Sequence, residues 1–163
     1  METLIRNFFT HLSLVFLVLA NLVAVIRIVI RKTSPWEELF KWNALLGVGT
    51  GCMYAFMIHA FFPSVSARAV GWDPSPFQWE VAMANFGVGL LGILSFRAGY
   101  GFRVAAVISL VCWFWGAAIG HVRQMIVAGN FAPGNAGSWF WLDVLAPALM
   151  IALIVAMKKD KAA

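Results

Sequence analysis

Five long runs of apolar residues dominate the chain, and short polar or proline- and glycine-containing stretches separate them. The runs cover residues 4–30, 36–62, 76–96, 102–128 and 138–157. Each run is about 20 residues or longer, which is enough for an α-helix to cross a hydrocarbon core of roughly 30 Å. The pattern predicts an all-α integral membrane bundle of five transmembrane helices, in a single transmembrane domain over residues 1–163.

The ends of the runs carry the residues that begin and end helices. Ser34 and Pro35 precede the second run and Pro63 follows it, while the third begins at the Ser75–Pro76 pair. A serine before a proline in the first turn is typical of a helix start, and a helix commonly stops before a proline. The first run is too long for the core of a signal peptide, so we expect it to be a retained transmembrane helix.

Composition places the chain in the membrane class. Of its 163 residues, 62% are hydrophobic and only 12% are charged, whereas about a quarter of the residues in a soluble domain are charged. The 8 Trp and 14 Phe residues fit this class, because aromatic side chains gather at the lipid–water boundary. We therefore expect this basic protein to contact membrane lipids and not to bind nucleic acid.

The basic residues are unevenly divided between the two sides of the predicted bundle. One side has Arg6, Arg68 and Arg123, and the other has Arg27, Arg31, Lys32, Lys41, Arg97, Arg103, Lys158, Lys159 and Lys161. Loops rich in Lys and Arg stay in the cytoplasm. The pattern predicts a cytoplasmic C-terminus and, with five spans, an N-terminus outside.

Four ionisable residues within the runs lie at one depth near the predicted outer surface. His59, Glu80, His121 and Asp143 come from four different helices, each within roughly 5–11 Å of the outer boundary at 1.5 Å per residue. Charged side chains inside a span nearly always face the bundle interior or a polar cavity. We expect these four to converge in an outward-facing polar pocket. Asn85 and Gln124 are further candidate ligand-binding residues there.

Several kinds of ligand fit two imidazoles and two carboxylates. The set could bind a divalent metal ion such as zinc, iron or manganese through His59, Glu80, His121 and Asp143. It could also form a proton relay, or hydrogen-bonded pairs that bind no ligand. His59 and His121 could be axial haem ligands, although two carboxylates in the same layer favour a metal ion over haem. Glu80 and Asp143 could also simply stabilise the positive N-terminal ends of their helices.

The sequence offers no catalytic motif. It contains no phosphate-binding glycine loop, zinc-protease motif or nucleophile elbow, so an enzyme is not favoured. The first functional hypothesis is a membrane protein whose polar pocket binds a metal ion, proton or small polar solute for transport or sensing. The second is a non-catalytic membrane subunit that forms a homo-oligomer or joins a larger complex. Gly116 and Gly120, four residues apart, would then let a second helix approach closely.

Two segments resemble a known family. The strings GWDPSPFQWEVAMANFGVG and WGAAIGHVRQMIVAGNFAPGNAG are similar to those of an uncharacterised family of small bacterial multi-span membrane proteins, which is known as a domain of unknown function. The resemblance covers residues 71–143. It implies a prokaryotic multi-pass membrane protein and brings no activity or substrate. We expect this protein to lie in the inner membrane.

Overall fold

The computed structural model describes residues 11–160, and every regular element in this range is a helix. Five stretches are long and apolar enough to cross a membrane, namely Leu12–Arg31, Pro35–Phe61, Phe77–Ser95, Tyr100–Ala128 and Pro133–Asp160. The prediction of an all-α protein with five helices able to span a membrane is confirmed by their length and composition. The beginning of the first predicted run, at residue 4, lies outside the described residues.

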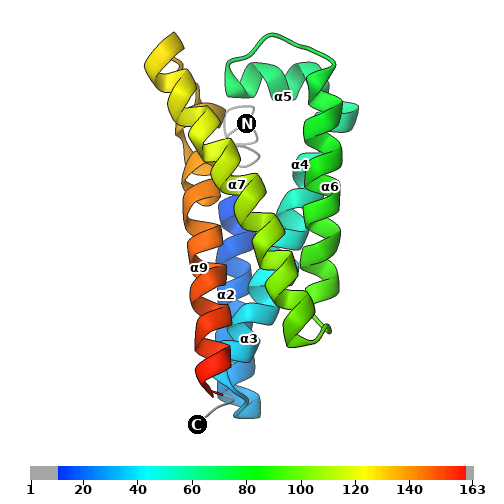
Figure 1. The fold of residues 1–163 in the computed structure, drawn as a ribbon, viewed down its shortest axis with the longest axis vertical. Coiled ribbons are helices and arrows are strands. Elements are labelled where there is room, and N and C mark those ends of the chain that lie inside the picture. Colours follow the sequence, from blue (N-terminus) through cyan, green and yellow to red (C-terminus); the bar gives the residue numbers. More distant parts are fainter. Residues whose placement is uncertain (1–10, 161–163) are drawn as a thin grey trace, which may run out of the picture.

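The helices of the membrane-spanning stretches run roughly along one axis (Figure 1). They are α2 (Leu12–Arg31), α3 (Pro35–Trp42), η1 (Asn43–Thr50), α4 (Gly51–Phe61), α6 (Phe77–Ser95), α7 (Tyr100–Ala128) and α9 (Ser138–Asp160). Two short helices, α5 (Pro63–Val70) and α8 (Pro133–Ala136), complete the described elements. Figure 1 shows α5 lying across one end of the bundle. We call this end, with α5 and α8, the capped end, and the opposite end, where α3 and α7 begin, the basic end.

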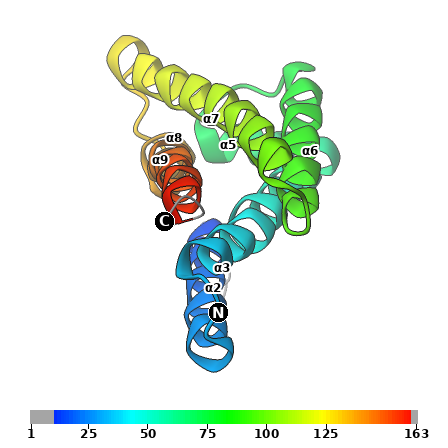
Figure 2. The same cartoon turned by 60° about the horizontal axis from the view of Figure 1, so that its bottom comes forward.

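The helices pack in a definite order around the second span. α6 packs against η1 and α4, and α2 packs against α3 and η1. α7 follows α6 after the short turn at residues 96–99, but it leans away from α6 and packs along α9. The two views agree on this divergence, since α6 and α7 meet at the basic end and separate toward the capped end (Figures 1 and 2).

The second span is interrupted by the π-helix η1, where the chain comes close to α6. A Cβ atom on Gly92 would lie 2.8 Å from the Ala44 carbonyl oxygen and 2.9 Å from the Gly49 nitrogen. Only glycine leaves room for these two backbones to touch. Small residues at helix contacts are the usual means of close packing in membranes, so Gly49 and Gly92 fix how α6 sits on the second span.

Buried apolar side chains form one cluster in the half of the bundle nearer the basic end. The cluster contains Phe40, Ala44, Val48, Cys52, Val88, Val107, Leu110, Met150, Leu153, Ile154 and Met157. The outward faces of the same helices are apolar too, as Leu94 of α6 is 58% exposed and Ile108 of α7 is 59% exposed. A helix that is apolar on its inner and outer faces is expected where the surrounding solvent is lipid.

Candidate functional site

The polar cluster at the capped end is centred on His121 of α7. Its Nε2 lies 3.5 Å from Oδ2 of Asp143 on α9, and its Nδ1 lies 2.7 Å from Oδ1 of Asn135 on α8. His121 is buried, and the side chains of His121 and Asp143 are only 11% and 16% exposed. One imidazole thus joins the helices α7, α8 and α9 within the membrane-spanning region.

The amide of Asn135 determines which nitrogen of His121 carries hydrogen. Asn135 is fully buried, and its Nδ2 donates to the backbone oxygens of Asn130 at 2.8 Å and His121 at 3.3 Å. Because Nδ2 faces two acceptors, Oδ1 must face His121, and an amide oxygen can only accept. The hydrogen-bond network therefore assigns the hydrogen of the neutral imidazole to Nδ1, which leaves the Nε2 lone pair directed at Asp143.

The two connections at the capped end hold this cluster in place. α7 ends at Gly129, whose φ of 60° is a left-handed conformation that glycine adopts without a steric penalty. The next residue, Asn130, donates through Nδ2 to the Val70 carbonyl at 2.9 Å. Trp72 stacks on the His121 ring, with centroids 6.3 Å apart. The loop after α5 and the loop after α7 therefore stabilise each other over the His121 site.

His59 belongs to a separate polar cluster. Its Nδ1 lies 2.6 Å from Oε1 of Gln78 on α6 and 2.8 Å from Oγ of Ser66 on α5. Ser66 Oγ also donates to Gln78 Oε1 at 3.2 Å. Gln78 and Ser66 are 2% and 3% exposed. The His59 ring thus joins α4, α5 and α6 and is satisfied locally.

Glu80 does not join the other predicted site residues. It is exposed on the first turn of α6, and its carboxylate makes no hydrogen bond or ion pair with any residue in the range 11–160. The expected contact between Glu80 and His121 is therefore wrong for the single chain. Equal depth sets the level of a side chain but not its direction around the helix, and α7 leans away from α6.

The expected four-residue metal site is not formed in the single chain either. Across residues 11–160, no group of three or more His, Cys, Asp or Glu residues is placed to hold a metal ion. The structure pairs His121 with Asp143, places His59 in its own cluster and leaves Glu80 outside both. A pair with one imidazole and one carboxylate offers fewer protein ligands than a typical closed zinc site needs.

The other two predicted site residues are also used within the bundle. Asn85 Nδ2 donates to the Val81 carbonyl at 2.9 Å, and its Oδ1 accepts from Trp113 Nε1 at 3.4 Å. Asn85 thus links α6 to α7. The backbone carbonyl of Gln124, not its side chain, accepts the backbone N–H of Asn130 at 3.2 Å, which helps to close the end of α7.

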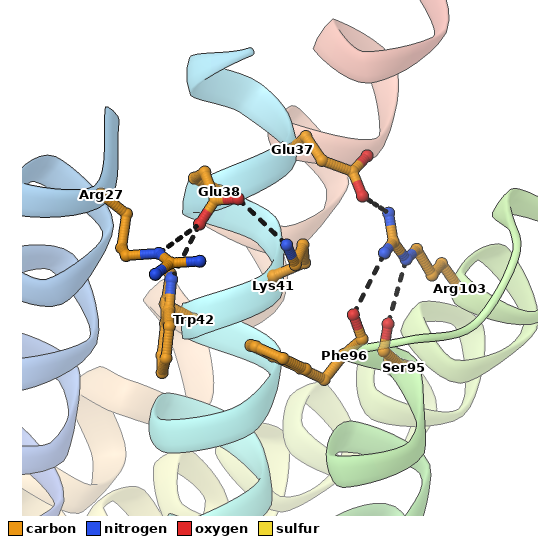
Figure 3. A network of polar contacts seen from close by, with 8 residues as sticks. All are labelled: Arg27, Glu37, Glu38, Lys41, Trp42, Ser95, Phe96 and Arg103. Atoms are coloured by element: carbon orange, nitrogen blue, oxygen red, sulfur yellow. Dashed lines mark hydrogen bonds and ion pairs between the residues drawn. The ribbon is translucent and has the colours of Figure 1, made fainter. Parts of the chain in front are cut away.

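Another polar network, which the sequence did not predict, lies at the basic end (Figure 3). Arg103 Nη1 pairs with Glu37 Oε1 at 2.7 Å, and its Nε donates to the Ser95 carbonyl at 3.0 Å. Nearby, Glu38 is 3% exposed and accepts from Lys41 Nζ and Trp42 Nε1, each at 3.0 Å.

The Arg103 contacts join α7 to α3 and to the end of α6, whereas the Glu38 contacts with Lys41 and Trp42 lie within α3. The signal that could have revealed them is Arg103 in the first turn of α7. A cation is unfavourable at that positive helix end and therefore needs an acidic partner.

The fold and the polar clusters define an all-helical membrane protein whose intramembrane histidine is paired with an aspartate. Residues 10–163 match the model of a family of unknown function, DUF6790, and the chain belongs to that family. This match is broader than the resemblance over residues 71–143. No curated protein and no solved structure matches the chain.

Proposed function

We propose that this protein is a proton-responsive multi-pass protein of the prokaryotic inner membrane, and that the His121–Asp143 pair is its proton-binding site. The observation that carries the proposal is the contact between His121 Nε2 and Asp143 Oδ2 at 3.5 Å. With hydrogen on Nδ1, neither Nε2 nor a carboxylate oxygen carries one. The contact is therefore favourable only after the pair binds a proton, either as imidazolium with carboxylate or as imidazole with carboxylic acid.

The position of the pair supports sensing over passage of protons through the bundle. The buried apolar cluster includes Val107 and Leu110 of α7, and on α9 it extends from Met150 to Met157. Along both helices these residues lie between the pair and the basic end. Apolar side chains cannot relay a proton, whereas the pair itself lies close to the capped end. Proton binding there would strengthen the attachment of α7 to α9, because a charge-assisted hydrogen bond is stronger than a neutral one.

This response can be measured by hydrogen exchange in nanodiscs at several pH values. After correction for intrinsic exchange, we expect residues 129–137 to be about fivefold better protected once the pair has bound its proton, equivalent to roughly 1 kcal/mol. Asp143→Asn should abolish this difference. Asp73→Asn, which changes an exposed carboxylate in the neighbouring loop, should keep it. A pH-dependent difference that persists unchanged in Asp143→Asn would refute the proposed site.

We propose that the capped end faces outward. Among the described residues, Arg27, Arg31, Lys32, Lys41, Arg97, Arg103, Lys158 and Lys159 lie toward the basic end, against Arg68 and Arg123 toward the capped end. The positive-inside rule then places the C-terminus in the cytoplasm. Reporter fusions should give a cytoplasmic signal at the C-terminus and an external signal at the N-terminus. The same signal at both ends, or the reverse pair, would contradict this orientation.

A further inference from the structure

A groove opens between α6 and α7 where the two helices separate. It has a volume of about 610 Å³, and small residues form much of its lining, including Ala84 and Gly87 on α6 and Ser109 and Cys112 on α7. Cys112 and Gly87 are exposed. No described helix fills this groove, although it lies within two membrane-spanning segments. Its surface is mostly apolar, and its small side chains leave room for another helix to approach.

The wall of the groove on α7 continues into a second uncovered surface. Gly116 and Gly120 lie on the same side of α7 as Ser109 and Cys112, by the helical spacing of three, four and seven residues. Both glycines are exposed, and a Cβ atom added to either would meet nothing within 4 Å. The Gly-x-x-x-Gly pattern is a typical contact surface between membrane helices, and within residues 11–160 no helix covers it.

Two opposite charges lie on these same helix faces near the capped end. Glu80 shares its side of α6 with Ala84 and Gly87, and Arg123 shares its side of α7 with Gly116 and Gly120. Both side chains are exposed, and neither has a hydrogen bond or ion pair with another described residue. Unpaired charges within a span are costly, so each needs a partner other than residues 11–160 of its own chain.

We propose that a second copy of this chain occupies the groove in a parallel two-fold dimer. α7 of each copy would pack through Gly116 and Gly120 into the α6–α7 groove of the other. Glu80 of each copy would then pair with Arg123 of its partner. A two-fold interface must be complementary to itself, and this face carries one acidic and one basic residue at the same end of the bundle. The two charges therefore favour a second copy over an unrelated helix.

The proposal is tested by single-molecule photobleaching of C-terminally labelled protein in liposomes, over a range of protein-to-lipid ratios. The wild-type protein should show two-step bleaching. Glu80→Arg and Arg123→Glu should each weaken dimerisation about tenfold, because each removes both intermolecular ion pairs. The double variant Glu80→Arg/Arg123→Glu should restore it, which also excludes misfolding as the cause of the single-variant losses.

A large side chain on the glycine face of α7 is an independent test of the dimer in the same assay. Gly116→Leu should abolish two-step bleaching. The control is Gly101→Leu, which adds the same side chain about 20 Å away along α7, where space is also open. This control should leave two-step bleaching unchanged. Wild-type protein that stays monomeric at every ratio, or that associates only with a different protein, would overturn the proposal. Dimers that tolerate both charge reversals and Gly116→Leu would overturn it as well.

Discussion

Arg103→Met is expected to destabilise the bundle by roughly 2–4 kcal/mol. Arg103 is 5% exposed, and its guanidinium lies 2.7 Å from Glu37 Oε1 and over the Phe40 ring at 5.1 Å. Methionine keeps the apolar stem but leaves Glu37 without its cation and the Ser95 carbonyl without its donor. The expected loss stays below that of a fully buried pair because the Glu37 side chain is 33% exposed and can be partly solvated.

The matched control for this prediction is Arg97→Met, in the turn that precedes α7. Arg97 is exposed, so its replacement should change stability by no more than about 0.5 kcal/mol. Reversible unfolding in mixed micelles, followed by helical circular dichroism, measures both free energies. Equal losses for the two variants would show that Arg103 acts only as a surface charge and that the network at the basic end does not stabilise α3 against α6 and α7.

Asn135→Asp is expected to cost roughly 3 kcal/mol of stability, although it changes only an amide nitrogen to an oxygen. The new oxygen would face the Asn130 and His121 carbonyl oxygens, which now accept from Nδ2 at 2.8 and 3.3 Å. Acceptor then faces acceptor at a fully buried position. The same unfolding measurement provides the free-energy difference.

Asn135→Ala is the informative comparison for that variant. It removes the same hydrogen bonds without placing an oxygen against two carbonyls, so its cost should be smaller, roughly 1–2 kcal/mol. If Asn135→Asp is as stable as Asn135→Ala or more stable, the amide is oriented the other way. The assignment of hydrogen to His121 Nδ1 would then be wrong.

The five spans could be predicted from the sequence because a membrane helix needs an apolar run of about 20 residues, and such runs are unmistakable. The shorter elements gave no such signal. α5 has eight residues and lies across the bundle end, so its sequence carries no transmembrane run. The π-helix at Asn43–Thr50 depends on the close approach of Gly92 from α6, which is a tertiary contact that no local pattern reveals.

The candidate site was partly predictable for a related reason. Position along a helix gives depth, and depth brought His121 and Asp143 to one level, where the structure places them in contact. The direction of a side chain depends on how each helix is rotated and tilted by its neighbours. This is why Glu80 makes no contact with His121 and why His59 contacts Gln78 and Ser66 instead. Asn135, in a short helix between two loops, had no periodic pattern to place it.

The central claim is that the His121–Asp143 pair binds a proton at His121 Nε2, and nitrogen NMR of histidine-labelled protein in nanodiscs tests it directly. The variant His121→Gln assigns the signal. At alkaline pH we expect His121 to carry hydrogen on Nδ1 with Nε2 bare, and acidification through the range of about pH 8 to 5 to add a proton shared between Nε2 and Asp143. A neutral His121 with hydrogen already on Nε2, or one that binds no proton across this range, would contradict the account.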